Sequence, residues 1–329
     1  MGYHLASLPV DVRIGKLLIF GALLRCVDPM LSIAAVLSTR SPFLNLQSRE
    51  PDERHSIELK RKDISTKCGK SDHLVFAKTF ALFVAAKDKR GFCTQLGLSI
   101  DGMNNVRQLR KEYARDLSSI GFLPGGSSNP ALNVNADSIR MVSAALCAGM
   151  YSNVLHVIRP TQKYHDTAEG SVAALGKARE LQFYMWPDQE PAPEHAHRPN
   201  AHDPLWWRGE RAFVHPSSCN FEVGDFESPW LVYHEKVRTT RLYIRESTMV
   251  TPYALMLFGG RLDVQHQRGT ISVDKWVRFK AVARIGVLVK ALRTELDSLL
   301  ADKVESPDLD ISCTRLMEAI ESLLQGDGM

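Results

Sequence analysis

The side chains best suited to chemistry in this sequence lie in a short turn between two strand-like segments. The stretch ESPWLVYHEKVRTTRLYIRE alternates apolar and charged residues, and its turn region 235–240 brings two bases and two hydroxyls together. Lys236 and Arg238 supply cations. Thr239 and Thr240 supply hydroxyl donors, which can bind a phosphate oxygen or a 2′-OH group. The alternative is a solvated hairpin turn.

Other polar side chains offer weaker chemistry. His195, His197 and His202 fall in a Pro/His-rich insertion at 187–204, and Cys219 follows it, but no paired ligand spacing typical of zinc is present. No Ser/His/Asp or Cys/His arrangement stands out either. We therefore expect no catalytic residue, no metal site and no cofactor site in this chain.

Charge is distributed unevenly along the chain. Residues 1–294 carry a net charge of +11, and residues 295–329 carry −7. A basic body suits a polyanionic partner such as nucleic acid. An ordinary solvated surface is the alternative, because composition alone does not separate the two.

Length and composition limit the class of protein. A chain of 329 residues with 44% hydrophobic residues is long enough for two or three domains with a sizeable core. No run of about 18 apolar residues is present, so we expect no membrane span. The six cysteines include no CxxC pair, which favours reduced thiols in an intracellular compartment, cytoplasmic or nuclear.

The elements that position these residues follow a simple order. Helical periodicity dominates residues 16–122, except for a polar stretch at 46–70 that reads as a mobile loop. LPGGSSNP is a linker, and another helix follows it. Short β-rich segments then predict a small barrel or sandwich, with RLDVQH and WVRFKA among its strands, before amphipathic C-terminal helices with an acidic tail. The fold class is therefore α+β and multidomain.

Several stretches resemble one known family in their order and spacing. GYHLASLPVDVRIGKLLIFGALLRCVDPMLSIAAVLSTRSPF, GKSDHL, LCAGMYSNV, HPSS and ESPWLVYHEKVRTTRLYIRESTMVTPYALMLFGG resemble the C-terminal part of DEAH/RHA-type RNA helicases. The long FESPWLVYHEKV form is closest to the RNA helicase A branch. The resemblance implies the end of a winged helix (1–15), a helical ratchet-like domain (16–125), a linker with a connecting helix (126–150), an OB-fold domain (151–280, with the 187–204 insertion outside the barrel) and C-terminal helices (281–329).

The resemblance also implies a partner and binding residues. In such a barrel, strand loops line a groove that tracks a phosphodiester backbone, so we expect the turn at 236–240 to contact single-stranded or structured RNA. Arg107 and Arg110 share a helix flank with further bases and would lie near the channel wall; a solvated helix face is the alternative. His215, Ser217 and Ser218 in HPSS either contact RNA or cap the local backbone.

Aromatic residues offer one more choice. Trp230, Tyr233, Tyr243 and Tyr253 either stack on bases or, as alternating aromatic residues in strands usually do, belong to the core.

The sequence departs from the family in one respect. GSVAALGKA is the nearest match to a Walker A loop, but its glycines are one residue too far apart and Ala178 replaces the hydroxyl, so we interpret it as a helical segment. DERH at 52–55 lacks the preceding apolar strand of a DExH box, and we interpret it as a loop. ATP and Mg²⁺ would therefore bind only to motor domains, in cis or in trans, that this sequence lacks. We expect the chain alone to be inactive, and its abrupt beginning favours a truncation before Met1.

Two functions follow from these observations. The first is an RNA-binding accessory portion of a helicase, gripping single-stranded RNA above the motor domains and acting with a protein activator. The second is a protein-interaction scaffold or regulatory fragment without an RNA role. A steep salt dependence of RNA binding would favour the first.

Overall fold

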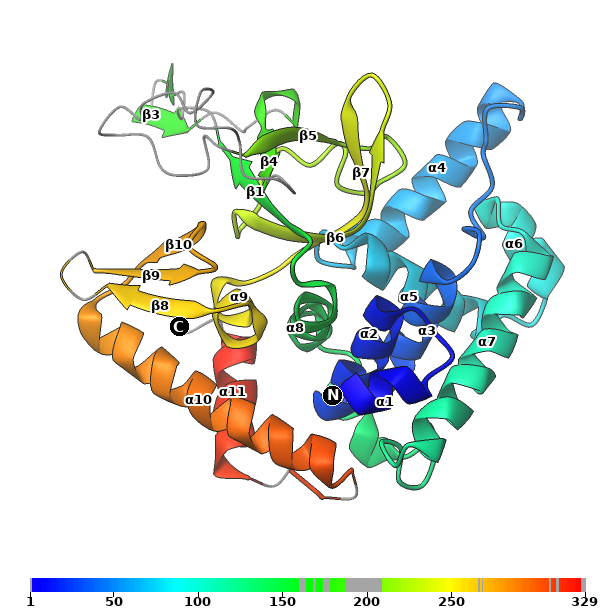
Figure 1. The fold of residues 1–329 in the computed structure, drawn as a ribbon. Helices are drawn as coiled ribbons and strands as arrows, with labels where there is room; N and C mark the ends of the chain where they lie inside the picture. Colours follow the sequence, from blue (N-terminus) through cyan, green and yellow to red (C-terminus); the bar gives the residue numbers. More distant parts are fainter. Residues whose placement is uncertain are drawn as a thin grey trace.

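The computed structural model describes residues 2–159, 164–167, 170–173, 178–186, 209–265, 267, 269–307, 309–311 and 314–326. Helices come first, strands follow and helices return, which confirms the predicted α+β class (Figure 1). The 187–204 insertion, with its three histidines, lies outside the described residues. The proposed domain boundaries stay a prediction.

Most of the N-terminal region is helical. Its helices are α1 (Gly2–Ser7), α2 (Val12–Leu23), α3 (Val27–Leu37), α4 (Pro51–Thr66), α5 (Asp72–Ala85), α6 (Lys89–Leu96), α7 (Ile100–Ser119) and α8 (Ile139–Met150). Side-chain caps start several of them. Ser71 Oγ accepts a hydrogen bond from Leu74 N at 3.1 Å and so caps α5, and Ser99 caps α7 in the same way.

The prediction of a loop at 46–70 was wrong, because these residues contain the 16-residue helix α4. A proline at its first position and two acids in its first turn favour a helix start there. Only Ile57 and Ile64 are buried along α4, so its apolar stripe is too narrow to show as a sequence period. The DERH sequence at 52–55 accordingly lies in the first turn of this helix and not in a loop.

Five strands close into a barrel, which confirms the predicted barrel over the sandwich alternative. They are β1 (Val154–Ile158), β4 (Gln182–Met185), β5 (Glu210–Val214), β6 (Trp230–Arg238) and β7 (Leu242–Met249), in the order β1-β4-β5-β7-β6. Closure follows because β1 pairs with both β4 and β6. Leu155, Phe183, Leu231 and Ile244 are among the side chains that fill the interior.

The later strands do not belong to the barrel, contrary to the prediction for RLDVQH and WVRFKA. After α9 (Pro252–Phe258), β8 (Leu262–Gln265), β9 (Thr270–Val273) and β10 (Val277–Lys280) form a separate three-stranded sheet. A closed barrel leaves no free edge for them to join. The sheet packs against α10 (Ala283–Glu305), where a Cβ on Gly286 would lie only 2.7 Å from Val264, and α11 (Arg315–Gly326) follows.

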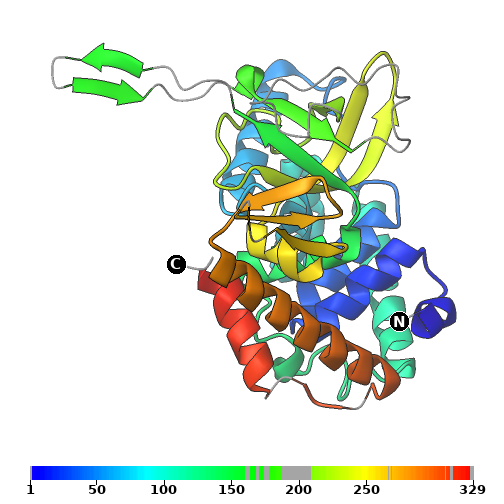
Figure 2. The same cartoon turned by 60° about the vertical axis from the view of Figure 1, so that its left-hand side comes forward.

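A hairpin projects between the first two barrel strands. β2 (Tyr164–Thr167) pairs antiparallel with β3 (Gly170–Ala173), and Figure 2 shows the pair extending away from the rest of the molecule. The Walker-like segment was interpreted as helical, but its first four residues form β3.

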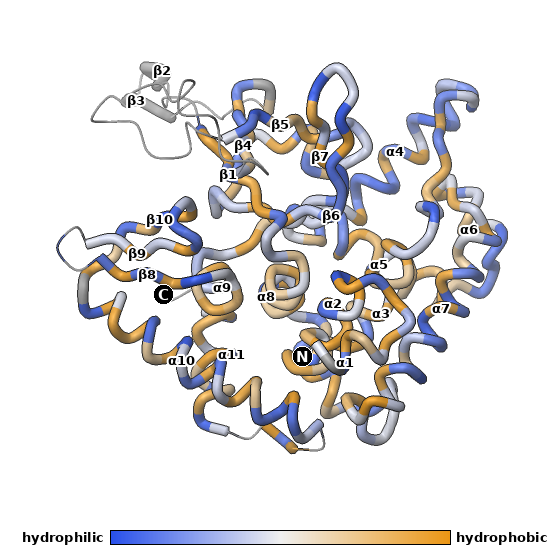
Figure 3. The backbone as a smooth tube through the Cα atoms, in the orientation of Figure 1, coloured by the Kyte–Doolittle hydropathy of each residue, from blue (hydrophilic) through white to orange (hydrophobic). Residues whose placement is uncertain are grey.

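Helix α8 joins the helical region to the barrel and to the C-terminal helices. Every residue from Met141 to Met150 is buried, as expected for a helix surrounded by protein. Figure 3 shows this hydrophobic helix at the centre of the molecule. A Cβ on Gly149 would lie 2.5 Å from the Leu17 side chain, so the glycine permits close packing of α2 on α8. The barrel is therefore held at a fixed place beside the N-terminal helices.

Candidate nucleic-acid interface

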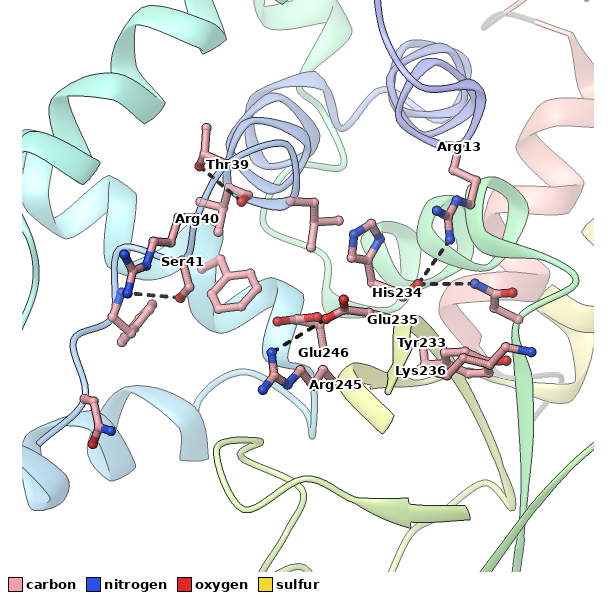
Figure 4. A pocket seen from close by; sticks show the side chains of 16 residues that line it. Arg13, Thr39, Arg40, Ser41, Tyr233, His234, Glu235, Lys236, Arg245 and Glu246 are labelled. Carbon is pink, nitrogen blue, oxygen red and sulfur yellow. Dashed lines mark hydrogen bonds and ion pairs between the residues drawn. The ribbon is translucent and has the colours of Figure 1, made fainter. Parts of the chain in front are cut away.

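A pocket of about 680 Å³ lies where the N-terminal helices meet the barrel, and we call it the helix–barrel groove (Figure 4). Its lining residues come from α2, the end of α3, the following loop, α5, Asn153, β6 and β7: Arg13, Val36, Leu37, Thr39, Arg40, Ser41, Phe43, Asn45, Phe76, Asn153, Tyr233, His234, Glu235, Lys236, Arg245 and Glu246. The groove therefore exists only when the two regions are assembled.

Basic and polar side chains dominate the groove. Its bases are Arg13, Arg40, Lys236 and Arg245, against the two acids Glu235 and Glu246. Arg245 Nη1 lies 3.7 Å from Glu235 Oε2, whereas Arg40 is exposed and forms no hydrogen bond or ion pair with the residues that the structure describes. Hydroxyls and amides from both sides add further donors. Such a lining suits a polyanion that carries its own hydrogen-bond acceptors.

The β6–β7 ribbon changes its course beside the groove. Glu246 has a φ of 48°, which is rare for a residue in a strand. Before Glu246 along β7, Ile244 faces the barrel interior, and after it Met249 packs against the same interior. Regular alternation would put these two residues on opposite faces, so the strand changes its faces between them. Opposite, the carbonyl of His234 accepts hydrogen bonds from Arg13 Nη1 at 3.3 Å and Asn153 Nδ2 at 3.4 Å. The helical region thus contacts the ribbon where its regular pairing is interrupted.

A buried carboxylate fixes the relative position of the two walls. Asp72, in the first turn of α5, is 6% exposed. Its Oδ1 accepts from Cys219 N at 2.7 Å, and its Oδ2 accepts from Ser218 Oγ at 2.6 Å and Ser247 N at 2.9 Å. All three donors belong to the barrel or its loops. A buried charge is tolerated when it is hydrogen-bonded in this way.

The neighbours of Asp72 extend this contact. Ser71 Oγ lies 2.6 Å from Thr248 Oγ1, and His73 Nδ1 lies 2.7 Å from the same hydroxyl. Asn220 Nδ2 donates to Ser247 and to the carbonyl of Lys70. Burial lowers the pKa of His73 to about 3, so this imidazole is neutral at physiological pH. We call this set of contacts between residues 70–73 and the barrel the Asp72 network.

The structure divides the residues expected at the turn. Lys236 lines the helix–barrel groove. Arg238 lies outside the lining set, and its guanidinium pairs with Glu210 at 2.5 Å. Thr239 and Thr240 are exposed in the turn, where Thr239 Oγ1 lies 3.5 Å from the carbonyl of Arg241.

The HPSS residues differ in their contacts. His215 Nδ1 and Ser217 Oγ lie 2.7 Å apart near the end of β5, and Ser217 is exposed. Ser218 is 8% exposed, donates to Asp72 and accepts from Asn220 N at 3.1 Å. The Ser218 hydroxyl thus bonds both to the local backbone and to α5, while RNA contact by the HPSS residues stays a prediction.

The basic flank of α7 is held by packing. Arg110 donates to the Asp28 carbonyl at 2.7 Å, pairs with the Asp28 carboxylate and lies over the Phe80 ring at 4.8 Å. Its side chain is 16% exposed. Arg107 lies over the Phe83 ring at 5.6 Å. Neither lines the groove, so the structure does not bring them together with Lys236.

Of the aromatic residues, Trp230 and Tyr233 are 4% and 3% exposed, which confirms the core interpretation for both.

Sequence reasoning missed three of the four groove bases. Arg13 lies in the first turn of α2, and no local pattern marks it. Arg40 stands between Thr39 and Ser41 just after α3, a base flanked by hydroxyls at a helix end, which is a readable signal. Arg245 was visible in YIRE as one of the alternating charges of β7.

Other chemistry has little support among the described residues. They include no group of three or more metal-ligating side chains, and the five described cysteines form no disulfide. None of the helices in the described part of the chain has the length and apolar character that a bilayer crossing requires.

Family models match three parts of the chain. Residues 11–76 match the ratchet-like helicase-associated domain (HA2), residues 142–262 match the oligonucleotide/oligosaccharide-binding (OB) fold, and residues 269–326 match the C-terminal domain in RNA helicases. The residues that line the groove all fall within the first two matches: those from Arg13 to Phe76 in the ratchet-like domain and those from Asn153 to Glu246 in the OB fold.

Curated relatives match nearly the whole chain. DHX57 of Mus musculus is 35% identical over 99% of this chain and 24% of its own length. The ATP-dependent DNA/RNA helicase DHX36 of Homo sapiens is 35% identical over 93% of this chain and 27% of its own length. The ATP-dependent RNA helicase DHX29 of Mus musculus is 30% identical over 99% of this chain and 22% of its own length. The chain thus spans about a quarter of the length of these relatives. Along nearly its whole length the chain is therefore similar to the C-terminal region of DEAH-box RNA helicases, with matches to the ratchet-like helicase-associated domain, the OB fold and the C-terminal domain.

Proposed function

We propose that this chain grips single-stranded RNA in the helix–barrel groove, as the accessory C-terminal portion of an ATP-dependent RNA helicase. The observation that carries the proposal is the groove itself, which is lined by four bases from the helical region and the barrel. A cationic groove beside an OB fold is the arrangement used by proteins that track a nucleic-acid backbone.

The lining suits backbone contacts more than base readout. Arg40, Lys236 and the hydroxyls of Thr39 and Ser41 would bind phosphate and ribose oxygens, which position a strand without reading its sequence. Arg238, Thr239 and Thr240 remain proposed contacts for RNA that leaves the groove over the hairpin, where Arg238 would exchange Glu210 for phosphate. Arg107, Arg110, His215 and Ser217 are weaker candidates, because their described contacts are with protein.

The partners of the chain follow from the same proposal. The relatives are named as ATP-dependent helicases, so we propose that motor domains in cis or in trans supply ATP and Mg²⁺ chemistry. A protein activator and an intracellular location, cytoplasmic or nuclear, belong to the same proposal.

The direct test compares two double variants that each remove two exposed bases. Arg40→Ala with Lys236→Ala removes charge from the groove, and Lys87→Ala with Arg90→Ala removes equal charge outside it. Binding of a labelled oligouridine about twelve nucleotides long would be followed by fluorescence anisotropy in a salt series. At about 0.3–1 kcal/mol per exposed contact, the groove variant should bind roughly 3–30-fold more weakly.

The salt dependence provides a second readout. Loss of two phosphate contacts should reduce the slope of log affinity against log salt by about 1.4 for a single strand. Equal binding by both double variants, with unchanged slopes, would reject the groove as the RNA site.

A protein-interaction scaffold remains the second candidate function. Val282, Ile285, Val287 and Leu288 near the start of α10 are exposed apolar side chains. Absence of RNA binding by the parent chain at low salt would favour this alternative.

A further inference from the structure

Glu246 stands out among the residues that line the helix–barrel groove. It is half-buried, it has a left-handed backbone in the middle of β7, and it lies beside a second carboxylate, Glu235. Figure 4 shows both carboxylates close to the Arg245 guanidinium. Strained backbone of this kind costs about 1–3 kcal/mol and tends to occur at functional sites. An acid held there, inside a groove suited to an anion, calls for a physical account.

Ionisable groups surround Glu246 from the elements packed on β7. They are Asp72 and His73 on α5, His234, Glu235 and Lys236 on β6, Arg245 on β7, His215 after β5, and Arg13 and Arg40 across the groove. The remaining neighbour, α8, carries Arg140 as its only charged side chain, and that side chain donates to the Gln325 carbonyl. The nearest electrostatic influences on Glu246 are thus two carboxylates and one guanidinium.

These surroundings favour the neutral form of the Glu246 carboxyl. Burial, reinforced by Asp72 and Glu235 and opposed by Arg245, raises the pKa of Glu246 from 4.5 to about 7. The charge of this group therefore changes near neutral pH. Burial lowers the pKa values of His73, His215 and His234 from their usual 6.5. These imidazoles therefore lose their protons at a lower pH than Glu246 does.

We propose that Glu246 takes up a proton when single-stranded RNA enters the helix–barrel groove, so that RNA affinity is set by pH at this one carboxyl. The inference rests on the proposed function and adds a regulation to it. A phosphate bound to Arg245 would stand close to the Glu246 carboxylate, because Figure 4 shows that carboxylate beside the Arg245 guanidinium. Like charges at short distance favour protonation of the carboxyl, so the bound state holds the proton more firmly than the free state.

The sign and size of the effect follow from linkage. Below about pH 6 the Glu246 carboxyl is already protonated in the free protein, so RNA binds without proton uptake at this site. Above pH 7 the proton must be taken up on binding, so affinity falls as the pH rises. If the bound state stays protonated throughout, affinity should fall about tenfold between pH 6 and pH 8, with uptake of about half a proton at pH 7.

The test uses Glu246→Gln and Glu235→Gln, which each remove one negative charge from the groove. Oligouridine binding would be measured by anisotropy at pH 6, 7 and 8 at constant salt. Proton uptake would be measured by calorimetry at pH 7 in two buffers with different ionisation enthalpies. We expect about a tenfold drop for the parent and less than a twofold drop for Glu246→Gln. Glu235→Gln should keep a pH dependence, with its midpoint at a lower pH, because Glu235 helps to raise the pKa of Glu246. If Glu246→Gln does not fold, Glu246→Asn replaces it, because asparagine tolerates left-handed backbone.

The outcomes separate this inference from the proposed function. RNA binding by the parent with no proton uptake, or with the same pH dependence in the Glu246 variant, would overturn the role of Glu246 and leave the groove as the RNA site. Absence of RNA binding at every pH would overturn both. Loss of the pH dependence in the Glu235 variant as well would assign the effect to the acidic pair and reject Glu246 alone.

Discussion

Replacing Asp72 with alanine should separate the helical region from the barrel more effectively than any other single change near the groove. The carboxylate accepts three hydrogen bonds, from Ser218 Oγ, Cys219 N and Ser247 N, at 2.6–2.9 Å. All of them join α5 to the barrel side. The alanine variant leaves these three donors buried without an acceptor, and water cannot easily replace the lost oxygens in a site that is 6% exposed.

The cost can be estimated from those three bonds. Each unsatisfied buried donor costs about 1–3 kcal/mol, and relaxation keeps most single substitutions below about 5 kcal/mol. We therefore expect Asp72→Ala to lower the free energy of unfolding by about 3–5 kcal/mol. At about 2–4 °C per kcal/mol for chains of this size class, the melting temperature should fall by roughly 6–20 °C.

Asparagine at position 72 gives an intermediate expectation. Whichever way the amide is turned, its NH₂ group faces one backbone N–H, of Cys219 or of Ser247, so one donor stays unsatisfied. Asp72→Asn should therefore cost about 1–3 kcal/mol. Asp63→Ala is the matched control, because Asp63 is 69% exposed and has one ion pair, with Lys67 at 2.9 Å. That control should change stability by about 0.5 kcal/mol or less.

Thermal unfolding followed by circular dichroism measures all three variants. The order of melting temperatures should be parent and Asp63→Ala, then Asp72→Asn, then Asp72→Ala. If Asp72→Ala melts within about 2 °C of the control, the Asp72 network does not hold the two regions together, and the reasoning on the groove walls fails.

Two further predictions concern acid stability and catalysis. Burial lowers the pKa of His73 from 6.5 to about 3 in the folded chain. Below pH 6.5 the unfolded chain therefore takes up a proton at His73 that the folded chain does not, and the free energy of unfolding falls by up to about 1.4 kcal/mol per pH unit. Unfolding in urea at pH 7 and pH 5 should show a smaller loss for His73→Gln than for the parent, and equal losses would contradict the assignment. The purified chain should hydrolyse ATP no faster than a buffer blank, with or without RNA, because the sequence lacks a Walker A loop. ATP turnover above the blank would contradict this prediction and show a nucleotide site that the sequence motifs do not reveal.

The sequence predicted those parts of the fold whose signals are local. The alternating segments around Leu231 and Ile244 marked barrel strands. Helix α4 was missed because only Ile57 and Ile64 are buried on it, which leaves no period to read. The strands after residue 260 were wrongly assigned to the barrel. No single segment of sequence shows which strands pair to close a barrel, so the sequence did not reveal that five earlier strands already close it.

The site was less accessible to sequence reasoning. Lys236 was found because it belongs to a turn with several donors, but Arg13 joins the groove from more than 200 residues away through its bond to His234. Arg110 looked like a surface base, yet it is fixed by Asp28 and the Phe80 ring. Whether a base is available for a ligand depends on its neighbours in space, and one sequence does not supply them.

Photocrosslinking of RNA to the chain tests the central claim most directly. An oligouridine that contains 4-thiouridine would be irradiated with the chain, and the crosslinked peptides would be identified by mass spectrometry. The helix–barrel groove predicts crosslinks on both walls, in residues 39–45 after α3 and in 233–246 on β6 and β7. Crosslinks confined to surfaces outside these segments, such as the outer face of α7, would contradict the account.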